Sequence, residues 1–230
     1  MGNKLKMGED MKMNQIDVFK SVKSNAINEL APELLETALD SLIESEALKD
    51  IPIFGIAFKS YSLYKKITES FFTKKILKFL IELKDIPQTK REEFITELES
   101  KNETKQAGEK LLIILNRLDD DNKATIIGKL FKNTILGKVT FDNFKRLTYI
   151  IDNTYLDDLE LLKDNEYLQN INVDIKSNLY KVGLLNQSIK DSRKHEEYKS
   201  KLTGRKEIIP SSFEYSLNSY GRILIENGFN

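Results

Sequence analysis

Apolar residues recur at the three- and four-residue spacing of an α-helix through most of this chain, and capping or turn residues separate the recurring segments. An amphipathic helix buries its apolar face only against another element, so a succession of such segments packs into a bundle. Between Asn14 and Ser45 the pattern predicts two short helices, the second beginning at Pro32. We therefore expect a helical bundle over residues 14–164, preceded by a flexible N-terminal tail over residues 1–13.

Capping residues predict where several helices of this bundle begin. Pro52 and Gly55 interrupt the helical pattern, after which Thr73 is placed to cap a helix over residues 76–83. Residues 85–89 form a predicted turn, and Thr89 at its end is placed to cap the next helix. The segment 108–118 is apolar on all sides, which predicts a helix at the centre of the core.

Strong stop and start signals follow that central segment. The acidic run Asp119–Asn122 ends it and caps a helix over residues 123–136, which Gly137 terminates. Thr140 then opens a helix through Ile151, and Asn153-Thr154 cap one more through Leu162.

The pattern changes after about Asn165. A helix through Leu168, Ile171, Ile175 and Leu179 leads into residues 180–185, and a charged stretch poor in helix signals follows. Residues 208–215 have the β-branched and aromatic content of a strand, and residues 216–228 have the pattern of a capped final helix. The order of helix, strand, loop, strand and helix is that of a wing between two helices.

This ending resembles a common form of the winged-helix domain, in which a Leu-x-x-x-Gly-Leu-Leu phrase ends a helix and Tyr-x-Leu-[ST]-x-x-Gly closes the wing. The matching residues are Leu179, Gly183, Leu184, Leu185, Tyr215, Leu217 and Gly221, followed by Ile223, Leu224 and Ile225 in the closing helix. Asn218 departs from the usual Ser or Thr. Gly183 lets the helix turn into the first strand, and Gly221 lets helix and strand backbones approach. The resemblance implies a winged-helix-like domain over residues 165–230, so the expected fold class is mainly α.

The helical body resembles uncharacterised helical proteins of bacterial genomes and mobile elements. The residues that carry this likeness are the segments 74–80, 115–120 and 140–147. It implies no known activity and hints at a bacterial regulatory setting or one of phage defence.

The charge balance and the absence of cysteine exclude several function classes. Lys and Arg total 36, as do Asp and Glu, so no overall field favours nucleic acid or an anionic membrane. A chain with no cysteine has no disulfide, thiolate nucleophile or zinc–thiolate site. The longest nearly unbroken apolar run, 51–58, is far shorter than the ~20 residues of a membrane-spanning helix. We expect a cytoplasmic protein.

The polar clusters give no catalytic or metal-binding pattern. Asp119–Asp121 and the acids at 157–160 fit helix capping better than magnesium binding. The loop around Gly137 lacks the carboxylates that calcium requires. His195, the single histidine, lies in a charged stretch with no evident partner to orient it. We therefore expect no enzyme, no metal, no cofactor and no small-molecule substrate.

Residues 59–91 alternate basic and aromatic side chains, a pattern that fits two interpretations. An amphipathic pair of helices with its aromatic residues in the core and its lysines in water is the simpler one. The alternative is a surface for a membrane or a partner, in a segment 51–83 that would act as a membrane-associating effector. Its candidate contact residues are Lys59, Lys65, Lys66, Lys74, Lys75 and Lys78.

Two further hypotheses concern the C-terminal part. The leading one is a non-enzymatic interaction or regulatory protein that contacts a protein partner or a second copy of itself, with the winged helix as its recognition or dimerisation module. The alternative is a DNA-binding winged-helix regulator, in which cations contact phosphates. The candidate residues for nucleic acid or a partner are Lys176, Lys181, Arg193, Lys194 and Lys199.

Overall fold

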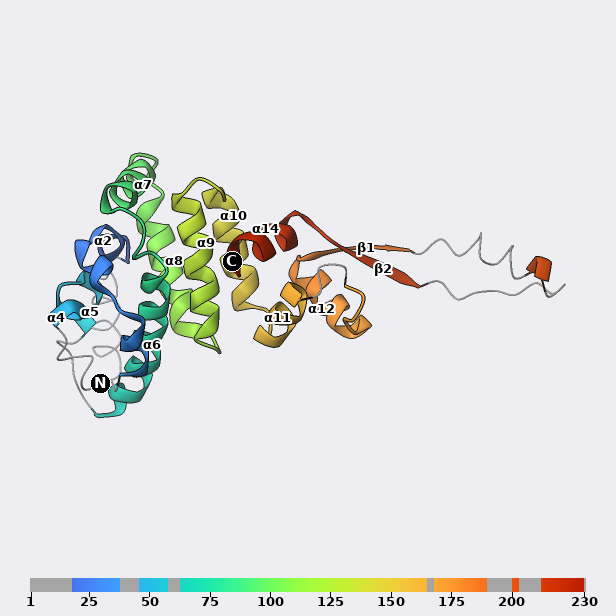
Figure 1. The fold of residues 1–230 in the computed structure, drawn as a ribbon, viewed down its shortest axis with the longest axis horizontal. Coiled ribbons are helices and arrows are strands. Elements are labelled where there is room, and N and C mark those ends of the chain that lie inside the picture. The colour runs from blue at the N-terminus through green and yellow to red at the C-terminus, as the bar shows by residue number, and fades with distance from the viewer. Residues whose placement is uncertain are drawn as a thin grey trace, which may run out of the picture.

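A computed structural model of the chain describes residues 18–37, 46–57, 63–164, 168–189, 200–202 and 212–229. For residues 46–47, 55–57 and 63–70 it describes the backbone alone. The described part is mainly α-helical, with one two-stranded antiparallel sheet near the C-terminus (Figure 1). This confirms the expected mainly α fold class.

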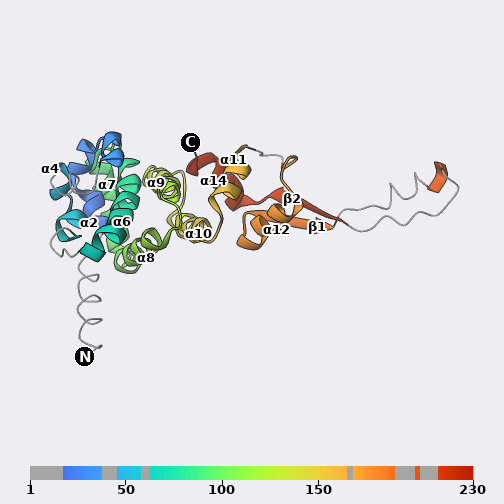
Figure 2. The ribbon, with the colours of Figure 1, turned by 90° about the horizontal axis from the view of Figure 1, so that it is seen from below.

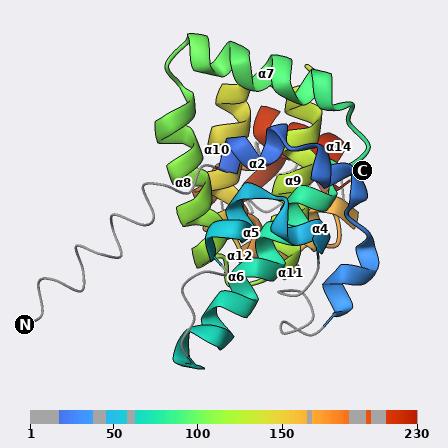
Figure 3. The same cartoon turned by 90° about the vertical axis from the view of Figure 1, so that its left-hand side faces the viewer.

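Short helices form the N-terminal end of the molecule. They are α2 (Val18–Lys23), the 3-10 helices η1 (Asn25–Glu29) and η2 (Pro32–Glu36), α4 (Glu46–Lys49) and α5 (Pro52–Ala57). Pro32 begins η2 as its sequence context predicts. Pro52 begins α5 after a break that follows α4, so it interrupts the helical pattern as expected, whereas Gly55 lies inside α5 and does not. Seen from this end, α2 and α5 lie in front of the longer helices (Figure 3).

Three longer helices follow: α6 (Leu63–Ile81), α7 (Gln88–Ser100) and α8 (Thr104–Arg117). Thr73 does not cap a helix as predicted but lies buried inside α6, because residues 63–81 contain no glycine or proline to end that helix earlier. Thr89 is also interior, since α7 starts one residue before it, after Pro87.

The next helices are α9 (Asn122–Ile135), α10 (Phe141–Asp152) and α11 (Leu156–Asp164). Two boundary predictions are confirmed: Gly137 follows α9 with φ +75°, and the Thr140 hydroxyl accepts from the Asn143 N–H at the start of α10. The prediction that Asn153 and Thr154 cap α11 was wrong. Their side chains donate backwards, to the carbonyls of Tyr149 and Ile150 in α10.

The centre of the bundle is α9, because α6 and α7 pack on it from one side and α10 and α14 (Ser219–Gly228) from the other (Figure 1). A Cβ added at Gly128 of α9 would lie 2.8 Å from the Phe79 carbonyl oxygen, which shows how closely α6 and α9 approach. The prediction that 108–118 forms the centre was wrong: α8 buries one face, and Ile113 is 46% exposed.

The C-terminal part consists of α12 (Val173–Val182), β1 (Leu185–Ile189), β2 (Phe213–Leu217) and α14. The predicted helix through Leu168 begins only at Val173, because Leu168 has φ +58° and the Asn172 side chain caps α12. Of the predicted strand 208–215, residues 208–211 lie outside the described residues, and β2 extends past its end to 217. The final helix starts at 219 instead of 216, since 216 and 217 are still in the strand.

Both glycines of the winged-helix phrase have the local roles that the sequence predicts. Gly183 ends α12 with φ +94°, a left-handed conformation that favours glycine. A Cβ added at Gly221 would collide with the Leu184 carbonyl oxygen and lie 2.9 Å from Leu217, so α14 closely approaches the start of the hairpin.

The C-terminal helix packs back on the bundle. Lys129 Nζ donates to the Phe229 carbonyl at 2.9 Å, and Asn133 Nδ2 donates to the Asn227 carbonyl at 2.9 Å. A single cluster of buried apolar residues extends from α2 to α14. The two predicted parts, 14–164 and 165–230, therefore share a core, and their division remains a prediction.

Candidate functional site

The two strands present one uncharged face and one polar face. They pair antiparallel with Leu185 opposite Leu217, so alternate residues lie on the same side of the sheet. We define the hairpin face as the alternating set Leu185, Gln187, Ile189, Phe213, Tyr215 and Leu217. The other side carries Asn186, Ser188, Glu214 and Ser216, all of them exposed.

Burial along the hairpin face falls with distance from the bundle. Leu185 and Leu217, which start the ladder, are buried in the core. Ile189 and Phe213, paired at the other end, are 70% and 57% exposed. Figure 1 shows the strands running outward from the helices. Ile189 and Phe213 form an apolar cross-strand pair that remains largely in water. Covering such a pair is favourable, so this end of the hairpin is suited to contact with another surface.

Helix α12 extends the hairpin face. The rings of Tyr180 and Tyr215 meet edge to face with their centroids 6.4 Å apart. Gln187 Nε2 donates to the Tyr215 hydroxyl at 2.7 Å, which fixes that ring from the neighbouring strand. Tyr180 and Val173 are themselves 43% and 58% exposed. Exposed aromatic side chains held in place by neighbours are typical of protein contact surfaces.

The cations predicted for nucleic acid or a partner are only partly described. Lys176 and Lys181 both lie on α12, where Lys176 is half-buried and Lys181 is exposed. Arg193, Lys194 and Lys199, like His195, lie outside the described residues. These residues remain predicted contacts.

The lysines predicted for a membrane or partner surface separate into three groups. Lys59 lies outside the described residues, and Lys65 and Lys66 lie in α6 where only the backbone is described. Lys74 is half-buried on α6. Lys75 and Lys78 are both used inside the protein, at the corner between α8 and α9.

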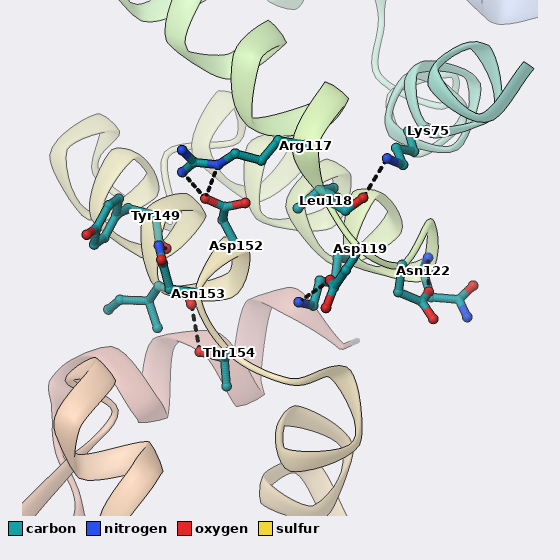
Figure 4. A network of polar contacts seen from close by, with 12 residues as sticks. Lys75, Arg117, Leu118, Asp119, Asn122, Tyr149, Asp152, Asn153 and Thr154 are labelled. Atoms are coloured by element: carbon teal, nitrogen blue, oxygen red, sulfur yellow. Dashed lines mark hydrogen bonds and ion pairs between the residues drawn. The ribbon is translucent and has the colours of Figure 1, made fainter. Parts of the chain in front are cut away.

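At that corner, lysine ammonium groups bind the end of one helix and the start of the next (Figure 4). Lys75 is buried and donates to the carbonyls of Asn116 and Leu118 at 3.0 and 2.5 Å. Burial lowers the pKa of its ammonium, against the opposing effect of Asp121 and Asp119. Lys75 is therefore not available to the predicted membrane or partner surface, because its ammonium binds carbonyl groups at the end of α8.

The acids of the corner are paired as well. Lys78 Nζ lies 2.7 Å from Asp121 Oδ1, and the buried Lys123 Nζ lies 2.5 Å from Asp119 Oδ1. The hydrogen bond from Lys123 lowers the pKa of Asp119. Asp120 accepts from the Asn122 N–H at 2.7 Å and so engages the first residue of α9, whereas the N-cap residue Asp121 makes no side-chain capping hydrogen bond. These acids are thus engaged in ending α8 and starting α9.

No group of three or more His, Asp or Glu side chains among the described residues could hold a metal ion. At the start of α11, burial raises the pKa of Asp158, and the neighbouring Asp157 acts in the same direction.

Comparison with protein-family models, with curated proteins and with solved structures finds no match for this chain. Within the described part, no helix combines the length and the apolar character needed to cross a bilayer.

The exposed pair Ile189 and Phe213 is not among the candidate residues predicted from the sequence. A signal for it exists, since Phe213, Tyr215 and Leu217 occupy every second position of one strand, and Leu185 and Ile189 fit the same period in the other. The short length of each strand and the long segment between them obscure that period.

Proposed function

We propose that this chain is a non-enzymatic binding protein that acts through protein–protein contacts, with its hairpin face as the contact surface. The observation that carries the proposal is the exposed cross-strand pair Ile189 and Phe213, on the same face as the buried pair Leu185 and Leu217. The paired acids and lysines at the α8–α9 corner support a non-catalytic role, because these polar groups stabilise helix ends.

The partner that fits the hairpin face is a second copy of the chain. None of its six residues is charged, so two such faces meet without like-charge repulsion. The net charge of zero adds no repulsion between whole copies. Two copies related by a two-fold axis would bring the same apolar surface together and close the assembly as a dimer.

The element order supports a winged-helix-like module as the dimerisation unit. Helix α12 precedes the hairpin, and α14 follows it. Together with the glycines at 183 and 221, this is the order that the resemblance implies. The likeness of the body to bacterial and mobile-element proteins supports a regulatory setting of that kind.

Sedimentation equilibrium tests the proposal. The wild-type chain should form a dimer in a concentration-dependent way, and the double variant Ile189→Ser/Phe213→Ser should be monomeric because the apolar contact area is lost. Ser188→Ala, on the polar face, is the matched control and should dimerise like the wild type. A wild-type chain that stays monomeric up to about 100 μM, where a typical specific interface is already formed, would rule out the dimer.

DNA binding is the second candidate, and the composition of the segment between the strands favours it. Residues 190–212 contain seven basic side chains and four acidic ones, although the whole chain is neutral. The basic residues are Lys190, Arg193, Lys194, Lys199, Lys201, Arg205 and Lys206. In this function they and the α12 residues Lys176 and Lys181 would contact phosphates.

Fluorescence anisotropy with labelled duplex DNA distinguishes the two functions. DNA binding should weaken steeply with salt and should be lost in Arg193→Glu/Lys194→Glu, whereas Ile189→Ser/Phe213→Ser should leave it intact. No binding at low salt would dismiss this candidate.

A further inference from the structure

A groove of about 390 Å³ lies between α8 and α10, away from the hairpin face. The two helices pack side by side (Figure 2). Its lining residues are Ala107, Lys110, Leu111, Ile113, Ile114 and Arg117 of α8, and Phe144, Lys145, Thr148 and Tyr149 of α10. Most of these lining side chains are apolar or aromatic.

The groove leaves large apolar side chains in water. Phe144 and Leu111 form its floor and belong to the buried core. Ile113 and Tyr149, on its two walls, are 46% and 57% exposed. The sequence pattern did not predict the exposure of Ile113, because apolar residues on all sides of α8 indicated that this helix is completely buried. An apolar patch whose floor is already fixed by the core costs little to order on binding.

Three cations surround this apolar floor. Lys110 is exposed and has no ion pair with a described residue. The Arg117 guanidinium pairs with Asp152, whose side chain is only 4% exposed, while Arg117 remains 54% exposed on the groove side. Lys145 lies 2.8 Å from Asp142 and 3.9 Å from Glu103, neither of which lines the groove. The lining therefore carries three cations and no acid, and the acids that pair with Arg117 and Lys145 lie outside it.

We propose that this groove binds an amphipathic α-helix of a partner protein, with the apolar side of that helix on the floor and acidic side chains along its flanks. Helix-in-groove recognition uses apolar anchors at positions i, i+3 or i+4, and i+7. From Ala107 to Arg117 the wall spans about 15 Å at the helical rise of 1.5 Å per residue, which matches about three turns of a partner helix. The acidic flanks meet Lys110, Arg117 and Lys145.

Two other occupants fit the groove less well. A second copy would bring the same cations face to face, and like-charge juxtaposition opposes association. A small apolar molecule is normally enclosed over most of its surface, whereas this groove is only partly enclosed. A helix, in contrast, needs only one face covered.

A display selection with the full-length chain tests the proposal. The library consists of 16-residue helical peptides with random apolar positions at i, i+3, i+4 and i+7 and with Glu, Lys or Ser at the flanking positions. Selection on the wild-type chain should enrich peptides with Glu flanks. Their affinity should fall about tenfold or more for Ile113→Ser and Tyr149→Ser, since apolar anchors dominate such contacts.

Charge reversal provides the specific control. Lys110→Glu/Lys145→Glu should bind the Glu-flanked peptides weakly and the matching Lys-flanked peptides better, whereas Lys105→Glu, on α8 outside the groove, should bind as the wild type does. Circular dichroism verifies that each variant is folded. Enrichment of no peptide, or binding that the groove variants leave unchanged, would overturn the proposal.

The proposed dimer is separable from this site. Ile189→Ser/Phe213→Ser should retain peptide binding, and the groove variants should retain the dimer. A dimer that Ile113→Ser abolishes and the hairpin variant preserves would show that a second copy occupies the groove, and it would also overturn the proposal.

Discussion

The Asn218 amide joins the end of α12 to the start of α14, because its Nδ2 donates to the Gly183 carbonyl at 2.8 Å. On its other side, Asn218 Oδ1 accepts from the Gly221 N–H at 2.9 Å and caps α14. Asn218 stands where the winged-helix phrase has Ser or Thr. Its amide has separate donor and acceptor atoms and so bonds to both groups, whereas a single hydroxyl oxygen would have to serve both. This bridge holds together the base from which the hairpin extends.

Substitutions at Asn218 should separate its two roles. Asn218→Ala should lower the free energy of unfolding by about 1–2 kcal/mol or more, because it removes the cap and leaves the Gly183 carbonyl without its donor. Asn218→Asp keeps the cap but places a carboxylate against that carbonyl. Its free energy of unfolding should therefore lie between those of Asn218→Ala and the wild type. Urea denaturation measures the series. Asn178→Ala, exposed on α12, is the control; equal effects at both positions would contradict the bridge.

Gly221→Ala should be strongly destabilising. Its Cβ would overlap the Leu184 carbonyl oxygen, which is backbone and cannot move without shifting the hairpin. We expect a loss of about 2–3 kcal/mol, in the range of overpacking substitutions, measured as a shift in the urea midpoint. Arg222→Ala tests an exposed neighbour in the same helix, and a Gly221→Ala protein as stable as that control would refute the close approach.

Arg91→Met should detach the N-terminal segment. The buried Arg91 donates from Nε to the Val22 carbonyl at 2.8 Å and from Nη2 to the Ser24 carbonyl at 2.9 Å, and Nη1 donates to the Ile86 carbonyl. Loss of these donors should cost about 3 kcal/mol or more, since each buried carbonyl left unpaired costs 1–3 kcal/mol.

Hydrogen exchange locates that effect. Amide protection should fall across residues 18–30 in Arg91→Met, whereas the exposed Lys90→Met should leave the pattern unchanged. Uniform loss of protection over all helices would show that Arg91 does not act through the N-terminal segment.

Glu82 should make stability fall as pH rises. Burial raises the pKa of its carboxyl, and Asp85 acts in the same direction, although Lys129 and Lys132 oppose them. The folded protein therefore holds this proton more tightly than the unfolded chain, so stability decreases from the ordinary pKa of 4.5 up to the folded-state pKa and is then constant.

The comparison of wild type with Glu82→Gln isolates this contribution. As pH rises from about 4 to about 8, the wild type should lose stability relative to the variant, by the linkage between proton binding and folding. Glu93→Gln, exposed on α7, provides the reference for an unburied carboxylate. If the wild type instead gained stability relative to Glu82→Gln as pH rises, the effect of Lys129 and Lys132 on the Glu82 pKa would outweigh that of burial.

The sequence predicts the elements that depend on local signals and fails where distant segments decide. Thr140, Gly137 and Gly183 act within one helical turn, and their predicted roles are confirmed. Thr73 has the chemistry of a cap, but an uninterrupted α6 buries it. Nothing in the local pattern distinguishes Lys75 from a surface lysine, because its acceptors are carbonyls more than forty residues away.

The same limit applies to the candidate site. The period of two in each strand is local, but whether Ile189 and Phe213 are buried depends on how far the strands extend from the bundle. Each strand has only five residues, of which the inner ones reach the core. Exposure of the outer pair is therefore a property of the tertiary arrangement.

Crosslinking through single cysteines tests the hairpin dimer most directly, since the chain contains no native cysteine. Gln187→Cys lies on the hairpin face, and Ser188→Cys lies next to it on the polar face. A short bis-maleimide should link two copies of Gln187→Cys efficiently and two copies of Ser188→Cys poorly, with both thiols titrated by a mono-maleimide to correct for accessibility. Equal crosslinking at the two positions, or none at either, would contradict a dimer formed through this face.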